Sequence, residues 1–177
     1  MPQAVTHILV ALIVASFIYA KVKDKNKFPL KYVLIAGIAG ILPDLDVALY
    51  GILYWFGYSL ETIHRTFLHS IWIPLLFLVL ALVISRKARI RVDDKLLRWK
   101  YILLMIFLGV SLHLVLDATL CGQIMPFAPF SNYQIGFDLV SYLPSPLNSI
   151  VIPSLDAALL ILWLIYLEKK HKISRFI

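Results

Sequence analysis

Long runs of apolar residues dominate this chain of 177 residues and limit what it can fold into. Five segments are candidates for membrane-spanning helices, because a bilayer core of about 30 Å is crossed by about 20 apolar residues. They run approximately over Val5–Ala20, Tyr32–Tyr54, Phe67–Ser85, Tyr101–Leu120 and Leu147–Leu167. Hydrophobic residues make up 61% of the chain and charged residues only 15%, which is more apolar than a soluble domain. The sequence therefore predicts an all-α, polytopic membrane helical bundle that forms a single domain over residues 1–177.

Breaker residues interrupt three of these segments. Pro74 and Pro153 lie inside the third and fifth segments, where neighbouring helices can satisfy the carbonyl groups that a proline frees. In the second segment Gly37, Gly40 and Pro43 together indicate that the helix breaks or ends. The first segment has its positive charges after the apolar run, the reverse of a signal peptide, so we expect a retained helix.

Basic residues predict how the helices are oriented. Of the 17 Lys and Arg residues, five lie in residues 21–31, seven in residues 86–100 and four in residues 169–175. With five spans these three segments fall on one side, which the positive-inside rule makes cytoplasmic, with the N-terminus outside and the C-terminus inside the cell membrane. The net charge of +7 then needs no nucleic acid partner. The single cysteine, Cys121, excludes an internal disulfide and a cysteine-cluster zinc site.

Most other ionisable residues lie at the opposite, outer end of the predicted bundle. Of the five histidines only His171 is on the cytoplasmic side. Ionisable groups inside a membrane are energetically costly and mark functional sites. The residues at the outer end are His7, Asp44, Asp46, Glu61, His64, His69, His113, Asp117 and Asp138.

Two acidic motifs lie in the outer halves of the spans. In HLVLD, His113 and Asp117 are four residues apart and share one helix face, where they form either a metal site or a structural hydrogen-bonded pair. In PDLD, Asp44 and Asp46 follow Pro43. A broken turn there would let both carboxylates face one cavity, whereas a plain helix end would expose them at the interface.

The segment HRTFLHS supplies His64, Arg65 and His69. A spacing of five residues does not align the two histidines on a regular helix, so we expect His64 in the loop or first turn and His69 on the third span. A lone interfacial histidine is usually structural, but these two flank the only arginine of the outer side. His7, near the start of the first span, lies at the same predicted depth.

Four histidines and three aspartates from four helices thus gather at one end. Neutral imidazole and carboxylate are ligands of zinc and other divalent metals, and seven such residues suffice for two ions. Two ions close together activate water and hold both oxygens of a displacement at phosphorus. Arg65 could bind a phosphate oxygen through its planar fork, and whichever of Asp44 and Asp46 is not a ligand could act as general base.

Two further features have alternative explanations. The loop over Cys121–Pro146 contains four prolines and several aromatic residues. It either covers the site or anchors the chain at the membrane interface. Asp156, within the fifth segment, is either a partner that orients a histidine or a buried polar group.

The motifs TH near the N-terminus, PDLD, HRTFLHS and HLVLD resemble those of the YdjM-like family of membrane-bound, metal-dependent hydrolases. The resemblance covers about residues 5–120. That family is similar to the zinc-dependent phospholipase C and single-strand nuclease superfamily, which is all-helical. The resemblance implies metal ligands at His7, Asp44 or Asp46, His64, His69, His113 and Asp117. A third metal is not expected, because no histidine lies between His113 and His171.

The sequence therefore predicts a membrane-embedded hydrolase that uses one or two divalent ions, zinc first, and cleaves a phosphoester. Its partners would be membrane lipids and a small-molecule or lipid phosphoester, with no nucleic acid. A transporter or metal-ion carrier is the alternative, but it would place polar groups in both halves of the membrane and usually contain repeats, which this sequence lacks. A structural or regulatory membrane subunit would explain the apolar segments but not the clustering of His and Asp.

Overall fold

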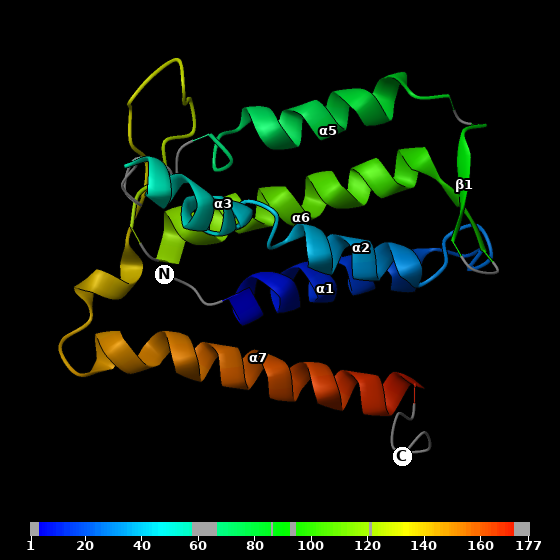
Figure 1. Ribbon diagram of the computed structural model, residues 1–177. Coiled ribbons are helices and arrows are strands. Elements are labelled where there is room, and N and C mark those ends of the chain that lie inside the picture. Colours follow the sequence, from blue (N-terminus) through cyan, green and yellow to red (C-terminus); the bar gives the residue numbers. More distant parts are fainter. Residues whose placement is uncertain (1–3, 58–66, 86, 93–94, 121, 172–177) are drawn as a thin grey trace.

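The computed structural model of the protein describes residues 4–57, 67–85, 87–92, 95–120 and 122–171. These residues are mostly helical, as predicted, with one short hairpin. Figure 1 shows helices α1, α2, α5, α6 and α7 lying roughly along a common direction. In chain order the elements are α1 (Ala4–Lys21), α2 (Lys31–Ala39), α3 (Leu45–Leu53), the 3-10 helix η1 (Tyr54–Phe56), α5 (Trp72–Val83), β1 (Arg89–Val92), β2 (Lys95–Arg98), α6 (Trp99–Leu120), the 3-10 helix η2 (Leu139–Tyr142) and α7 (Leu147–His171).

Three of the described helices are long and apolar enough to cross a membrane. They are α1, α6 and the Leu147–Lys170 part of α7. The 12 residues of α5 rise about 1.5 Å each, which makes this helix shorter than a bilayer core of about 30 Å. Helices α2 and α3 have nine residues each. The described residues thus contain three candidate spans where the sequence predicted five, and the orientation of the chain stays a prediction.

The second apolar segment is divided by a turn over residues 40–44, as the sequence predicted. Helix α2 ends before Gly40, and Pro43 follows in the turn. Proline has no N–H and cannot continue the helical hydrogen-bond ladder. The turn therefore places Asp44 directly before α3 and Asp46 in the first turn of that helix.

The third apolar segment starts its helix later than predicted. Residues 67–71 form turns, in which the Ser70 hydroxyl donates to the Phe67 carbonyl at 2.7 Å. Helix α5 begins at Trp72, so Pro74 falls in its first turn, where the missing N–H costs no helical hydrogen bond. The turns leave His69 just outside the helix, not on a span.

The centre of the bundle lies where α1, α2 and α6 pack together. Tyr32 of α2 and Met105 of α6 are buried there. One turn further along α6, Gly109 lets the backbones of α6 and α2 approach closely. A Cβ atom on Gly109 would lie 2.8 Å from the Ala39 Cβ and 2.9 Å from the Gly40 nitrogen. Small residues at helix contacts are typical of membrane bundles, where van der Waals packing drives helix association.

A β-hairpin closes one end of the bundle (Figure 1). Its strands β1 and β2 are antiparallel, with Ile90 opposite Leu97. Leu97 is buried in the central cluster, and the Arg98 N–H donates to the Tyr32 hydroxyl at 2.6 Å. This hairpin was not predicted, because the sequence indicates only a basic connection over residues 86–100.

The loop between α6 and α7 is fixed to the opposite end of the bundle. The Ile71 N–H donates to the Pro126 carbonyl at 2.9 Å, and the Phe137 N–H donates to the Ala118 carbonyl at 2.7 Å. The loop therefore lies against the start of α5 and the end of α6. It also keeps a set of aromatic side chains exposed, as at a membrane interface. These are Phe127, Phe130, Tyr133, Phe137 and Tyr142.

Candidate metal centre

Imidazole and carboxylate groups from several parts of the chain meet at the end of the bundle away from the hairpin. They come from the first turns of α1, the start of α3, the turn before α5 and the second half of α6. Only the Asp44 side chain is partly exposed, at 27%, so the centre is open on the Asp44 side. The residues brought together are His7, Asp44, Asp46, His69, His113 and Asp117.

The close contact of α6 with α2 fixes the ring of His113. His113 and Asp117 follow Gly109 at intervals of four residues, so all three lie on one face of α6. His113 Nδ1 lies 2.7 Å from the Gly40 carbonyl oxygen. A carbonyl oxygen only accepts, so Nδ1 carries a proton and donates. In the neutral ring Nε2 then presents a lone pair to the centre.

A carboxylate lies behind the His69 ring. Its Nδ1 lies 3.2 Å from Asp46 Oδ2, an acceptor that favours a proton on Nδ1. Its Nε2 lies 3.1 Å from His113 Nε2. Two neutral rings held in these tautomers would direct lone pairs at each other. A proton or a cation between them removes that repulsion.

Asp117 completes a triangle of donor atoms with the two histidines. Its Oδ2 lies 3.4 Å from His69 Nε2 and 3.6 Å from His113 Nε2. Zinc forms bonds of about 2.0–2.1 Å to nitrogen and oxygen, so two ligand atoms on one tetrahedral ion lie about 3.3 Å apart. The three separations in the triangle, including the 3.1 Å between the two nitrogens, are close to that value. The residues present therefore fit a divalent ion.

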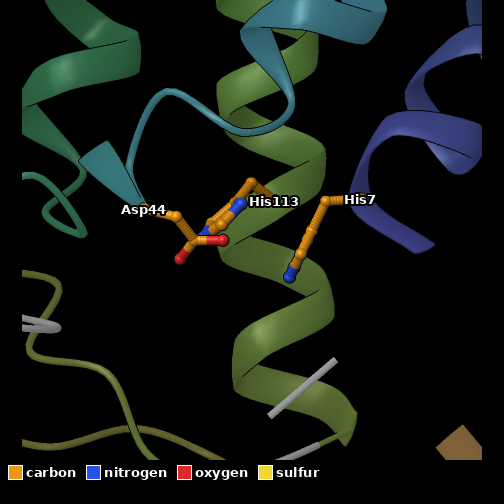
Figure 2. Close-up of side chains that lie close together, drawn as sticks. All are labelled: His7, Asp44 and His113. Carbon is orange, nitrogen blue, oxygen red and sulfur yellow. The ribbon is translucent and has the colours of Figure 1, made fainter. Parts of the chain in front are cut away.

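Asp44 approaches the same two nitrogens. Its Oδ1 lies 3.6 Å from both His69 Nε2 and His113 Nε2. Figure 2 shows Asp44 beside His113, with His7 of α1 directed toward the same space. Donor atoms of His7, Asp44 and His113 lie within 4.8 Å of one another, so they form a second possible ligand group. Both groups contain His113, whose Nδ1 is already bonded to Gly40, so the two groups share the single donor atom Nε2.

His7 packs on His113 with ring centroids 3.9 Å apart and planes 23° from parallel. His7 Nε2 lies 3.4 Å from Asp117 Oδ1, the oxygen that is not part of the triangle. His7 Nδ1 is buried and has no hydrogen-bond partner among the described residues. A Cβ atom on Gly40 would lie 2.7 Å from the His7 carbonyl oxygen, so α2 and α1 can approach this closely only because residue 40 is glycine.

The carboxylates of the centre give it a negative charge that a cation would neutralise. Three carboxylates, of Asp44, Asp46 and Asp117, lie within 3.6 Å of the His69 ring. Burying an unpaired carboxylate is costly, and the cost is greater in a membrane, where water is scarce. Protonated histidines or a bound divalent ion would offset these charges.

A family model described as YdjM inner membrane protein matches residues 1–172 of this chain. The chain belongs to the YdjM family. The match extends past the end of α6 and through α7, beyond the residues 5–120 that carried the resemblance in the sequence. Comparisons with curated proteins and with solved structures found no match. The family and the three apolar helices make this chain a multi-pass protein of the inner membrane.

Two predicted site residues of the YdjM protein, His64 and Arg65, lie outside the described residues. Their roles stay predictions. The other six predicted ligands lie together, although Asp46 approaches His69 at Nδ1, on the ring edge away from the triangle. The Gly40 carbonyl, which the sequence did not predict as part of the site, orients the His113 ring.

Asp156, whose role the sequence left open, contacts a threonine. The Thr6 hydroxyl donates to Asp156 Oδ1, and both residues are buried. Asp156 Oδ2 has no hydrogen-bond partner among the described residues. This contact joins α7 to α1 at the residue before His7. No role was predicted for Thr6, and in the sequence only its position next to His7 in the TH motif indicates one.

Proposed function

We propose that this YdjM-family protein is a membrane-embedded, metal-dependent hydrolase that cleaves a phosphoester. The observation that carries the proposal is the donor triangle of His69 Nε2, His113 Nε2 and Asp117 Oδ2, with separations of 3.1, 3.4 and 3.6 Å. An acceptor oxygen lies behind each ring, the Gly40 carbonyl 2.7 Å from His113 Nδ1 and Asp46 Oδ2 3.2 Å from His69 Nδ1, as proteins commonly place around metal-binding histidines.

Asp44 is suited to act as the general base. It is the one partly exposed carboxylate of the described centre, and its Oδ1 lies 3.6 Å from both histidine nitrogens of the triangle. A divalent ion, when bound, supplies Lewis acidity and makes water a better nucleophile. Asp44 would accept the proton of the attacking water, while Asp46 holds the His69 ring in position.

Arg65 would bind the phosphoryl group of the substrate. It lies four residues before His69 and, in the predicted topology, is the one Lys or Arg residue at the outer end. Its guanidinium group can donate two parallel hydrogen bonds to phosphate oxygens, which a lysine cannot do.

The position of the buried charges favours a hydrolase over a transporter. Among the described residues, the buried histidine and acidic side chains are His7, Asp46, His69, His113, Asp117 and Asp156. The first five belong to the centre, and Asp156 contacts Thr6 beside it. A transport pathway needs polar groups through both halves of the membrane. The buried His and Asp side chains all lie at one end of the bundle, as expected for a reaction that takes place at one face of the membrane.

Metal analysis of the purified protein tests the centre. We expect one or two zinc ions per chain after purification in detergent at neutral pH without chelator. His113→Ala should lower the metal content sharply, because it removes a corner of the triangle. His171→Ala is the matched control and should leave the metal content unchanged. Wild-type protein that binds no divalent metal would contradict the proposal.

Activity on phosphomonoester, phosphodiester and phospholipid substrates tests the reaction. We expect hydrolysis by the metal-loaded protein, a loss of turnover in Asp44→Asn with metal still bound, and impaired turnover in Arg65→Lys. Arg65→Ala should be worse, since removing one donor from a developing charge costs about a hundredfold or more. If Arg65→Ala were as active as the wild type, Arg65 would not bind the substrate, and the proposal would lose its support for a phosphoester. Metal uptake into proteoliposomes without any hydrolysis would favour a transporter instead.

A further inference from the structure

A cavity of about 320 Å³ lies between α1 and α7. Its lining residues belong to the later parts of both helices, toward the hairpin end of the bundle (Figure 1). Ser16, Phe17 and Ala20 line it from α1, and Leu162 and Tyr166 line it from α7. Residues three or four apart share a helix face, so each helix presents one continuous stripe to the cavity. Ile13 and Trp163 complete the lining. The volume is that of a small ligand-binding pocket.

Hydrocarbon suits this cavity better than water does. A buried water needs two to four polar partners, and the lining is mainly aliphatic and aromatic carbon. The cavity is open at its sides, where Phe17 is 66% and Leu162 is 59% exposed. Both helices are long and apolar enough to cross a membrane, so the opening faces the acyl chains of the bilayer.

Both stripes end in lysines at the same end of the bundle. Lys21 follows Phe17 by four residues on α1, and Lys169 and Lys170 follow Tyr166 by three and four residues on α7. These lysines are exposed. An ammonium group near the bilayer surface attracts anionic lipid headgroups, and the aromatic ring of Tyr166 suits the interface just below them.

We propose that the α1–α7 cavity binds one acyl chain of an anionic phospholipid from the adjacent leaflet, with the lipid phosphate paired to Lys21 and Lys169. The charge of the lysines selects the headgroup, and the apolar stripes select the chain. This site is separate from the metal centre, because its α1 lining begins six residues beyond His7 and lies on the face toward α7.

Such a lipid would complete the packing of α7. Only 11% of the apolar window of α7 is buried, against 39% for α6, and α7 packs mainly on α1. A bound chain fills the gap between these two helices. It thereby holds α7 against α1, where the Asp156–Thr6 hydrogen bond lies next to His7.

Lipid binding to the delipidated full-length protein in neutral detergent tests the site by native mass spectrometry and thermal unfolding. The probes are long-chain phosphatidylglycerol, long-chain phosphatidylcholine and dihexanoyl phosphatidylglycerol. We expect long-chain phosphatidylglycerol to bind tightest and to raise Tm most. Lys21→Gln and Lys169→Gln should each weaken it about fivefold, since one basic residue near the surface contributes about that factor.

Cavity-filling variants test the chain site. Ala20→Phe and Leu162→Trp should abolish the Tm increase from long-chain phosphatidylglycerol while the metal content stays unchanged. Ile161→Phe is the matched control, because Ile161 is 57% exposed, precedes a lining residue and does not line the cavity. Equal binding of the two long-chain lipids, or undiminished binding in a folded cavity-filling variant, would overturn the proposal. Neither result depends on hydrolase activity.

Discussion

Asp117 contacts all three histidines of the described centre. Its Oδ1 lies 3.4 Å from His7 Nε2, and its Oδ2 lies 3.4 Å from His69 Nε2 and 3.6 Å from His113 Nε2. A carboxylate only accepts, so it stabilises rings that carry a proton or a metal and repels the lone pairs of neutral rings. The charge of Asp117 therefore affects whether each of the three imidazoles carries a proton or binds a metal.

Asp117→Asn removes this charge and almost preserves the shape of the side chain. We expect zinc affinity to fall at least about tenfold, since even the loss of an outer partner of a metal ligand has an effect of that size. The Tm increase produced by added zinc should shrink accordingly, because the stabilisation by a ligand grows with the logarithm of the ratio of its free concentration to its Kd. Zinc titration followed by thermal unfolding measures both.

The control for this substitution is Asp24→Asn, in the exposed connection after α1. Asp24 pairs with Lys27 at 2.9 Å in a surface contact of the kind that contributes little stability. Its zinc response should equal that of the wild type. An unchanged zinc affinity in Asp117→Asn would show that the triangle does not hold the metal.

Among the helices, the contact of α2 with α6 positions the centre. Gly109→Ala would place a Cβ 2.8 Å from the Ala39 Cβ and 2.9 Å from the Gly40 nitrogen. We expect a loss of stability of about 1–3 kcal/mol, as for overpacking in a close-packed core. The helices must also move apart, which lengthens the His113–Gly40 hydrogen bond and lowers the metal content.

Gly51→Ala is the matched substitution for this test. A Cβ on Gly51 of α3 would meet nothing within 4 Å. Alanine favours a helix over glycine by about 0.5–1 kcal/mol, so the stability of this variant should be unchanged or slightly higher. Unfolding in mixed micelles and metal analysis compare the two variants. Equal stability and equal metal content would contradict the close-contact argument.

The hydrogen bond between Thr6 and Asp156 joins α7 to α1 beside the centre. Thr6→Val leaves a buried carboxylate without this donor, and we expect it to reduce stability by about 1–2 kcal/mol. Replacing both partners, in Thr6→Val with Asp156→Leu, should recover part of that loss because no buried polar group is left unpaired. A double-mutant cycle of unfolding free energies measures the coupling, and additive effects would contradict it.

Local signals explain which elements the sequence could predict. Gly40 and Pro43 act on their own backbone, so the break between α2 and α3 was predictable. The later start of α5 was not, since the turns over residues 67–71 are bonded to Pro126 from a distant loop. The hairpin also depends on a distant contact, the burial of Leu97 against the α1–α2–α6 core.

At the scale of the whole molecule, the types of residue predicted where the centre lies, whereas helix packing determines which atoms contact one another within it. Histidine and aspartate are costly in a membrane, so their clustering was visible in the sequence. The roles within the cluster were not, because they depend on atoms far apart in the chain. The Gly40 carbonyl behind His113 and the position of Asp46 behind His69 are such cases.

The separation of charge between the two ends of the bundle gives the last prediction. The connection after α1, the hairpin and the end of α7 lie at one end, and the centre and the loop before α7 lie at the other (Figure 1). The first group contains most of the Lys and Arg residues. Loops rich in Lys and Arg are a general mark of the cytoplasmic side of membrane proteins. We therefore expect a reporter fused after Ile177 to be cytoplasmic and a reporter inserted near Ser131 to be external. Paired fusions to alkaline phosphatase and a fluorescent protein measure the two positions in cells, and the reverse pattern would move the metal centre to the cytoplasmic face.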